Sequence, residues 1–393
     1  MTENEIYLDN SATTRICPEA LEKYIAVSRE NYGNPSSRHR RGMMAEAEMR
    51  QARKNLLAAL GAKEGRILFT AGGTEANNLA ICGRAHAKER FRGGNLITSA
   101  GEHSSVSRTL EALRAEGFSV AAVPTAGGVL DLAALASLLT PNTVLVSVMA
   151  VNNETGALYD SKAAADLVHR LCPEALFHVD ATQSFMKVPF TPKSLGADMI
   201  TLSSHKIEGP KGMGALWVSD RILQSHGLSP LIFGGGQEAG LLSGTENVPG
   251  AAAFGEAARV YAAHLTERGA RMRALRDYLL RGLADASFPA GAVSPNLPAG
   301  ACAPHILSLT VNGMKSETVL NDLSGRGIYV SSGSACSSHD KKLSSALLAF
   351  GKSEGEADST IRISLSFRNT EAELDAFLAA LADICRNRAK KSR

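Results

Sequence analysis

The stretch Met199-Ile200-Thr201-Leu202-Ser203-Ser204-His205-Lys206 places a lysine just after a short apolar run. Earlier in the chain, the run Leu176-Phe177-His178-Val179 is followed in the same way by Asp180. Short apolar runs that end in polar residues are typical of buried β-strands. The two runs therefore predict strands that carry an acid and a lysine at their carboxyl ends.

Similar runs alternate with amphipathic, helix-like stretches from about residue 67 to 220, for example at 74–90 and 161–171. This alternation predicts an α/β fold with a mostly parallel seven-stranded sheet covered by helices. Ligands of such sheets bind beyond the carboxyl ends of the strands. The seven expected strands are 67–70, 96–98, 120–123, 144–148, 176–179, 199–202 and 215–218.

The rest of the chain predicts a second, smaller domain. A helical pattern without internal proline runs from Pro249 to about Ala286, and a Pro/Gly-rich hinge follows at 288–300. Beyond it the pattern is strand, helix, strand, a Ser/Gly-rich loop, a helix, a strand at 360–365 and a last helix. We expect a large domain over residues 15–260 and a small α+β domain that combines residues 1–14 and 261–393.

Composition excludes several classes of protein. Apolar residues make up 44% and charged residues 21% of the chain, as in ordinary globular proteins. The net charge of +3 is too small to indicate nucleic-acid binding. No apolar run reaches the roughly 18 residues of a membrane span, and no signal-peptide pattern follows the acidic N-terminus. The six cysteines show neither CxxC nor zinc spacing, so we expect no metal site and a reducing, cytoplasmic location.

Lys206 and Asp180 suit a pyridoxal phosphate (PLP) site. A lysine amine forms a Schiff base with the PLP aldehyde, and a carboxylate keeps the ring nitrogen protonated so that the ring can accept electrons. The turn Thr70-Ala71-Gly72-Gly73-Thr74-Glu75 would present the N–H groups of Gly73 and Thr74 at a helix N-terminus, which is an anion site. Taken alone, the same turn is more often an ordinary helix cap by Thr74, but together with Lys206 we favour the phosphate site.

Three more polar side chains are candidates for the site. His103 follows a predicted strand and could stack on a flat cofactor and move protons, although a lone histidine is more often structural. Asn153 also follows a strand and could bind the cofactor's phenolic oxygen, or it could simply form a turn. Asn34 lies in the turn 32–37 and is a candidate for contacting a polar substrate.

Two residues of the C-terminal part stand out. Cys336 lies in the small, polar loop Ser331-Ser332-Gly333-Ser334-Ala335-Cys336-Ser337-Ser338, where core packing offers little reason for a thiol. We read the other cysteines as small core residues. Arg362 interrupts an apolar strand, so its side chain either reaches out to solvent or binds a carboxylate in the interior; we favour the second.

Together these motifs resemble the cysteine desulfurases of the NifS/IscS group, which are class-V aminotransferase-like PLP enzymes of fold type I. The resemblance covers nearly the whole chain and is most specific in His205-Lys206 and the Cys336 loop. It implies a homodimer that converts L-cysteine to L-alanine and passes the sulfur to an acceptor protein for iron–sulfur cluster assembly or thiolation. Further matching stretches are Tyr7 to Thr14, Gly33 to Ser37, Val151 to Glu154, His178 to Gln183, Gly209 to Gly212, Ser243 to Thr245 and Ile361 to Ser364.

The resemblance also implies roles for individual residues. Lys206 would hold PLP, His103 would stack on its ring and act in acid–base steps, and Cys336 would take the sulfur as a persulfide. Asn34 and Arg362 would bind the substrate carboxylate. The remaining contacts would be with the cofactor: Asp180 at the ring nitrogen, Gln183 and Asn153 near the phenolic oxygen, Gly73, Thr74, Ser203 and His205 at the phosphate, and Thr245 at the phosphate of the partner subunit.

The chain departs from the family pattern at Leu242, where arginine is usual before Ser-Gly-Thr, and at Ser204, where glycine is common. It also ends soon after the last expected helix, which leaves the acceptor open. Two alternatives remain: a cysteine or selenocysteine lyase or class-V transaminase on the same fold, and a catalytically silent interaction subunit. The lyase and the transaminase do not need Cys336, and a silent subunit would be expected to lose Lys206 or Cys336.

Overall fold

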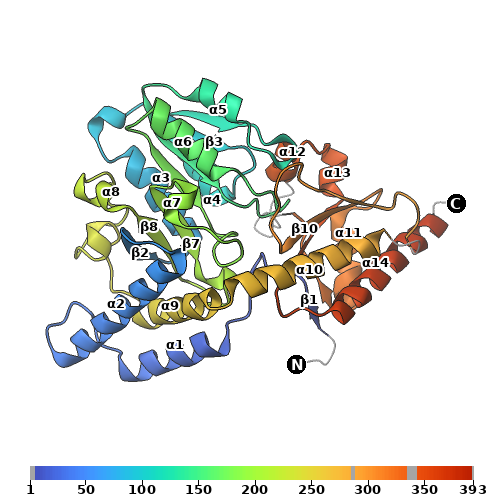
Figure 1. Ribbon diagram of the computed structural model, residues 1–393, viewed down its shortest axis with the longest axis horizontal. Helices are drawn as coiled ribbons and strands as arrows, with labels where there is room; N and C mark the ends of the chain where they lie inside the picture. The colour runs from blue at the N-terminus through green and yellow to red at the C-terminus, as the bar shows by residue number, and fades with distance from the viewer. Residues whose placement is uncertain (1–4, 285–287, 334–342, 392–393) are drawn as a thin grey trace.

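The computed structural model describes residues 5–284, 288–333 and 343–391. Its larger part is built on a seven-stranded sheet of order β2-β8-β7-β6-β5-β3-β4 (Figure 1). All pairs from β7 to β4 are parallel, whereas β8 runs antiparallel to both β2 and β7. The sheet confirms each strand expected from the sequence: β2 (Arg66–Thr70), β3 (Asn95–Ser99), β4 (Ser119–Val123), β5 (Thr143–Met149), β6 (Leu176–Asp180), β7 (Met199–Ser203) and β8 (Gly214–Val218).

Helices cover both faces of this sheet, which is why its central strands are buried throughout. Every residue of β5, β6, β7 and β8 is buried, as expected for strands enclosed on two sides. One face packs against α3 (Gly73–Ala85) and α4 (Ser104–Ala115). The other face packs against α2 (Arg40–Leu60), α5 (Leu132–Leu138), α6 (Ser161–Leu171) and α9 (Val248–Ala262).

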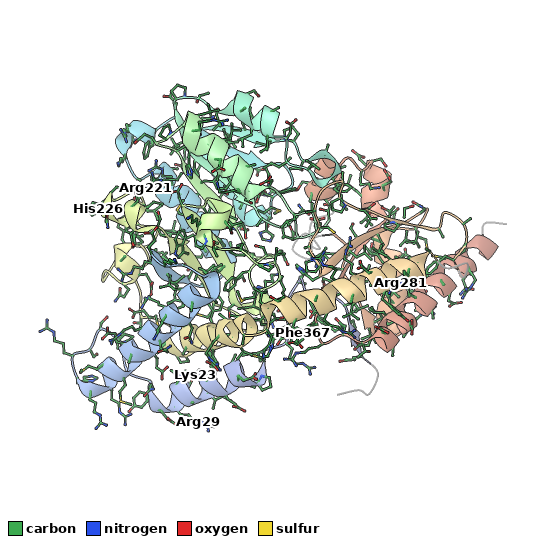
Figure 2. The ribbon with its side chains drawn as sticks, in the orientation of Figure 1. Lys23, Arg29, Arg221, His226, Arg281 and Phe367 are labelled. Atoms are coloured by element: carbon green, nitrogen blue, oxygen red, sulfur yellow. The ribbon has the colours of Figure 1, made fainter. Side chains whose placement is uncertain are left out.

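The prediction of a single long helix from Pro249 to about Ala286 is wrong in one respect, because this segment forms two helices. α9 ends at Ala262 and α10 (Leu265–Leu283) begins after His264, whose φ of −131° is not helical. The break falls where the packing partner changes. Tyr261 of α9 belongs to the core of the large sheet, whereas Leu275 of α10 belongs to the core of the smaller unit. Phe367 lies against this junction, with its ring 5.7 Å from that of Tyr261 (Figure 2).

The smaller unit contains an antiparallel sheet of order β12-β10-β9, formed by β9 (Val293–Pro295), β10 (Ile306–Val311) and β12 (Thr360–Ser364). Strand β1 (Ile6–Tyr7) pairs in parallel with β11 (Ile328–Tyr329). Leu8 shares a buried core with residues of α10 and of the C-terminal part, including α14 (Glu371–Lys391). The division into residues 15–260 and residues 1–14 with 261–393 stays a prediction, and a shared core of this kind is what it requires.

The remaining helices are short or lie at the edges of the two units. Among the described residues, none of the helices combines the length and the apolar character that crossing a bilayer requires. The remaining helices are α1 (Pro18–Glu30), α7 (Pro192–Leu195), α8 (Asp220–Gln224), α11 (Ser316–Gly325), α12 (Ser345–Phe350) and α13 (Glu354–Asp358). The 3-10 turns are η1 (Glu89–Phe91), η2 (Ala126–Gly128), η3 (Ser204–Lys206) and η4 (Glu238–Gly240).

The segment after β1 links the two units at the end of the central sheet. The N–H of Ser364 in β12 donates to the oxygen of Leu8 at 2.7 Å, and the N–H of Thr14 donates to the oxygen of His205 at 2.9 Å. These bonds bring Asp9, Ser11 and Ala12 beside the carboxyl ends of β6 and β7. The N-terminal segment therefore supplies one wall of the cavity described next.

Candidate active site

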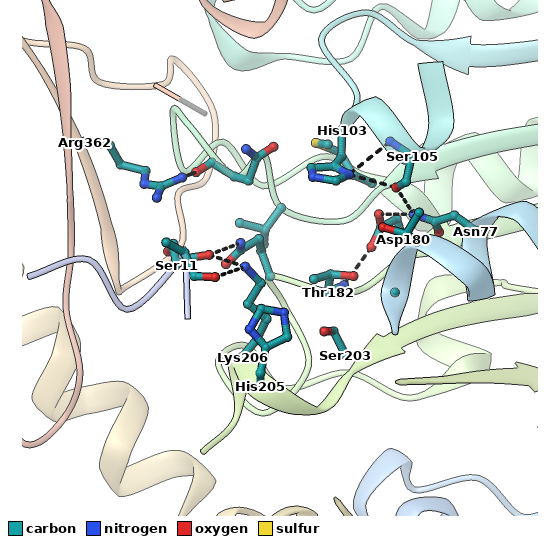
Figure 3. Close-up of a pocket in the computed structure, with 17 residues that line it drawn as sticks. Ser11, Asn77, His103, Ser105, Asp180, Thr182, Ser203, His205, Lys206 and Arg362 are labelled. Atoms are coloured by element: carbon teal, nitrogen blue, oxygen red, sulfur yellow. Dashed lines mark hydrogen bonds between the residues drawn. The ribbon is translucent and has the colours of Figure 1, made fainter. Parts of the chain in front are cut away.

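A cavity of about 190 Å³ lies at the carboxyl ends of the central strands, where they meet the smaller unit (Figure 3). Its walls come from β5, β6, β7, the first turns of α3 and α4, the N-terminal segment and β12. The lining residues are Ser11, Ala12, Gly73, Thr74, Asn77, His103, Ser105, Met149, Val151, Asn153, Asp180, Thr182, Gln183, Ser203, His205, Lys206 and Arg362. Most residues predicted from the sequence for this site are therefore brought together.

Lys206 lies in η3, the turn that follows β7. Its Nζ donates to the backbone oxygens of Ser11 and Ala12, each at 2.6 Å (Figure 3). Gln183 is buried beside it and donates from Nε2 to the same Ser11 oxygen at 3.0 Å. The backbone carbonyl groups of Ser11 and Ala12 thus hold the amine on the cavity wall.

Asp180 ends β6 and is buried at the opposite side of the cavity. Its Oδ1 accepts from the N–H of Thr182 at 2.9 Å, and its Oδ2 accepts from Nδ2 of Asn77 at 2.8 Å. Asn77 Nδ2 also donates to Oγ of Ser105 at 2.8 Å (Figure 3). These bonds fix the plane of the carboxylate, so Asp180 faces the cavity in one orientation.

His178 lies two residues before Asp180 and on the same face of β6, since side chains alternate along a strand. It is fully buried between Oγ of Ser147 at 2.8 Å and Oγ1 of Thr201 at 2.9 Å. Burial lowers the pKa of His178 to about 4. The ring is therefore neutral near pH 7 and adds no positive charge beneath Asp180.

His103 precedes α4 and caps it, because its Nδ1 accepts from the N–H of Ser105 at 3.2 Å. His103 thus has a structural role, which was the alternative for a lone histidine. The same ring also lines the cavity, on the wall across from Lys206 and His205 (Figure 3). The histidine can therefore both fix the helix start and face a bound ring.

The residues expected to hold a phosphate gather at the start of α3. A Cβ added to Gly73 would lie 3.1 Å from Oγ1 of Thr182 and 3.5 Å from Cβ of Ser203, so a side chain there would narrow the cavity. Burial, and the charges of Lys206 and Lys211, lower the pKa of His205 to about 4. A neutral His205 still offers one ring N–H. This corner combines such donors with the N–H groups of a helix N-terminus, which bind anions.

Arg362 lies on β12 and is almost fully buried, with 2% of its surface exposed. Its Nη2 donates to Oδ1 of Asp9 at 2.8 Å, and its Nη1 donates to the backbone oxygen of Asn153 at 2.9 Å. The expectation of a buried carboxylate partner, rather than a side chain that reaches solvent, is confirmed. Burial raises the pKa of Asp9 although Arg362 opposes the rise.

Two predicted residues are not in this cavity. Asn34 is exposed in the turn before α2, where its Oδ1 accepts from the N–H of Ser36 at 2.8 Å. Thr245 is exposed and does not line the cavity of its own chain. Leu242, the departure from the family pattern, is buried in the core that covers one face of the sheet. Cys336 lies outside the described residues.

Sequence reasoning assigned no role to the groups that support the predicted side chains. Asn77 and Ser105 lie inside helices and reach Asp180 only through tertiary packing. A weak signal for Asn77 was available, since it lies one helical turn after Gly73 and Thr74 and faces the same way. Of the other cysteines, Cys17, Cys172 and Cys385 are buried as expected, whereas Cys82 and Cys302 are only partly buried.

The donor set fits PLP. One cavity holds a lysine amine, a buried carboxylate with a fixed orientation, a histidine ring on its wall and a helix N-terminus lined by small residues. Lys206 would hold the cofactor, Asp180 would meet its ring nitrogen, and Gly73, Thr74, Ser203 and His205 would hold its phosphate. A carboxylate-binding arginine completes the set on the side of the smaller unit.

Known proteins resemble this chain over nearly its full length. Residues 6–377 match the family described as aminotransferase class-V. A "NifS/IcsS protein homolog" of Lactobacillus delbrueckii subsp. bulgaricus is 39% identical over 96% of this chain and 97% of its own. A "Cysteine desulfurase IscS" of Methanosarcina thermophila is 36% identical over 98% of this chain and 93% of its own. A solved structure of a "NIFS-LIKE PROTEIN" superposes with a TM-score of 0.88 at 36% identity, covering 97% of this chain and 99% of the other.

Proposed function

The chain belongs to the class-V aminotransferase family, and from that premise we propose that it is a PLP-dependent cysteine desulfurase. It removes sulfur from L-cysteine, releases L-alanine and keeps the sulfur as a persulfide on Cys336. The observation that carries the proposal is the meeting of Lys206, Asp180 and Arg362 around one cavity. Relatives named cysteine desulfurase, similar over nearly the whole chain, support it.

When bound, PLP supplies an electron sink for the charge that remains at the substrate Cα after proton loss. Arg362 binds and orients the carboxylate of cysteine through its planar fork. The Lys206 amine, which lines the cavity, carries a proton to and from Cα. Asp180, held by Asn77 and Thr182, keeps the ring nitrogen protonated.

The sulfur step needs a soft nucleophile. The Cys336 thiolate attacks the sulfur of the bound cysteine, so that an S–S bond forms and the Cβ–S bond breaks. The electron pair of the broken bond stays on the three-carbon fragment, which takes up protons and leaves as alanine. His103, on the cavity wall, is placed to move one of these protons.

We also propose that the active form is a homodimer in which Thr245 reaches the phosphate site of the second chain. Thr245 is exposed and does not line the cavity of its own chain, and Phe233, next to the Ile232–Leu242 bridge, leaves 81% of its surface uncovered. A dimer interface would cover this aromatic side chain. The substrate role of Asn34 stays a prediction, as do a cytoplasmic location and an acceptor protein for iron–sulfur assembly or thiolation.

The test is the mass of the intact protein after incubation with L-cysteine, measured with and without a reductant. We expect an added mass of one sulfur atom on the peptide that contains Cys336, removed by the reductant, together with free alanine. Alanine without a protein-bound sulfur would instead indicate a lyase. Keto-acid production from an amino donor would indicate a transaminase, and no turnover at all would indicate a silent subunit.

A further inference from the structure

One buried carboxylate touches the chain on both sides of the segment that carries Cys336. Oγ of Ser344, just after that segment, donates to Oε2 of Glu154 at 2.5 Å. On the other side, a Cβ added to Gly333 would lie 2.8 Å from the same Oε2. Gly333 also has a φ of +45°, which side chains disfavour. The backbone there can approach the carboxylate this closely because the residue is glycine.

Glu154 belongs to the turn that follows β5. This turn, through Asn153, forms part of the cavity wall. Oδ1 of Asn152 accepts from the N–H groups of Glu154 at 3.0 Å and of Thr155 at 2.9 Å, which fixes the turn. Asn153, between Asn152 and Glu154, accepts a hydrogen bond from Nη1 of Arg362 through its backbone oxygen. Glu154 is itself 6% exposed. Its side chain is therefore held rigidly, one residue from the contact with the substrate-binding arginine.

The backbone of Arg362 joins the same arrangement. Ser331 and Arg362 exchange two backbone hydrogen bonds, of 3.1 Å and 2.7 Å. After the segment, the hydroxyl of Ser344, which donates to Glu154, also accepts a hydrogen bond from the N–H of Leu347. Ser344 thereby caps α12. The chain before residue 334 is thus bonded to Arg362 and passes close to Glu154, and the chain after residue 342 is bonded to Glu154.

The electrostatic setting suits a fixed carboxylate. Burial raises the pKa of Glu154, and the Ser344 hydrogen bond with the nearby charges of Arg362 and His103 opposes that rise. Removing the hydrogen-bond donor of a buried carboxylate destabilises the folded protein, because water cannot reach the oxygen that is left without a partner. The Glu154–Ser344 contact is therefore costly to break.

We propose that Glu154 is a positioning residue for sulfur transfer: through Ser344 it holds one end of the Cys336 segment beside Arg362, to which the other end is bonded. Releasing one end lengthens the tether that delivers the thiol, which lowers its effective concentration at the substrate sulfur. Glu154 itself touches no reacting atom. The proposal rests on the desulfurase function and adds the device that brings the nucleophile to its substrate.

The test is a double-mutant cycle on the PLP-loaded enzyme with Glu154→Ala, Ser344→Ala and both together. Alanine formation is measured at saturating cysteine, and cysteine affinity is measured separately from the change in cofactor absorbance. We expect each single variant to lose about threefold in kcat with unchanged affinity, as for a doubling of the tether length. Because the two side chains form one contact, the double variant should lose no more than the worse single variant.

The chain offers a matched control and a conservative variant. Oγ of Ser353 donates to Oε2 of Glu356 at 2.8 Å, a pair of the same chemistry that does not line the cavity. Glu356→Ala and Ser353→Ala should leave kcat unchanged. Glu154→Gln keeps an oxygen acceptor for Ser344 and should retain most of the activity, and it keeps the test open if Glu154→Ala does not fold.

Additive losses in the double variant would overturn the proposal, as would wild-type kcat in Ser344→Ala. A loss of cysteine affinity that matches the loss of kcat would also overturn it, since Glu154 would then act through Arg362. A wild-type enzyme that forms no alanine would instead remove the proposed function itself. The two failures are therefore distinguishable.

Discussion

The guanidinium of Arg362 donates a hydrogen bond of 2.8 Å to the carboxylate of Asp9, across the boundary between β12 and the N-terminal segment. Within the described part of the chain, Nε of Arg362 has no hydrogen-bond partner. A buried N–H without a partner is costly, and a substrate carboxylate could satisfy it. Asp9 therefore fixes the arginine without using all of its donors.

Arg362→Lys should lower kcat/KM for cysteine on the order of 100-fold, because lysine keeps the charge and loses the planar fork. PLP content should stay near that of the wild type, since Arg362 lies on the substrate side of the cavity. Steady-state kinetics and the cofactor absorbance measure the two quantities. Unchanged kinetics in a folded variant would remove Arg362 from the substrate site.

Lys206→Ala should abolish turnover and the covalent attachment of PLP, because within the described residues Lys206 is the one lysine that lines the cavity. Borohydride reduction of the wild-type enzyme, followed by peptide mass analysis, should place the cofactor on Lys206. The matched variant Lys211→Ala, which changes the neighbouring lysine outside this cavity, should keep the attachment. A reduced cofactor on another lysine would refute the assignment.

Asn77→Ala should weaken PLP binding by about tenfold or more, because Asp180 loses the donor to Oδ2 and a buried carboxylate oxygen is left unpaired. Asn77→Asp should be worse, since it places a second carboxylate against the first. Titration of the unloaded enzyme with PLP, followed by absorbance, measures the change. Equal PLP affinity in both variants and the wild type would mean that Asn77 does not support the cofactor site.

Glu102 gives a pH-dependent prediction. Burial raises its pKa from an ordinary 4.5 to about 8, and within the described residues its Oε2 has no hydrogen-bond partner. Because folding raises the pKa of Glu102, its protonated carboxyl adds to the free energy of unfolding, and this contribution is fully present below pH 4.5. The contribution is lost as the pH rises through about 8. For one such proton, the free energy of unfolding falls by about 1.4 kcal/mol per pH unit within this range.

Glu102→Gln keeps an oxygen to accept from Ser99 and from the N–H of Met149 but carries no titrating proton. Denaturant unfolding at pH 6 and pH 8 should therefore show a smaller loss of unfolding free energy in the variant than in the wild type. The surface variant Glu111→Gln serves as the control. Parallel pH profiles for wild type and Glu102→Gln would show that Glu102 is ionised in the folded protein.

Much of this architecture could be predicted from the sequence, because its signals are local. The apolar runs predicted every strand of the central sheet, and the polar residues just after them predicted Asp180, Lys206 and His103 in one cavity. The break at His264 could not be predicted, since it follows a change of packing partner rather than a proline or glycine. Asn77 is also set by tertiary contact, as its partner Asp180 is distant in the chain.

Asn34 and Thr245 were predicted to belong to the site, and a single chain leaves both exposed outside its own cavity. For Thr245, the proposed dimer would supply the missing site on the second chain. A monomer in solution that holds PLP fully and turns over normally would contradict that role.

The most direct test of the account compares alanine formation by the wild type and by Cys336→Ser. The variant should keep PLP and bind cysteine, because the cavity residues are unchanged, but an oxygen nucleophile attacks thiol sulfur poorly. We predict nearly complete loss of alanine formation and no protein-bound persulfide in the variant. Alanine formed from cysteine at the wild-type rate by Cys336→Ser would contradict the persulfide mechanism and favour a lyase.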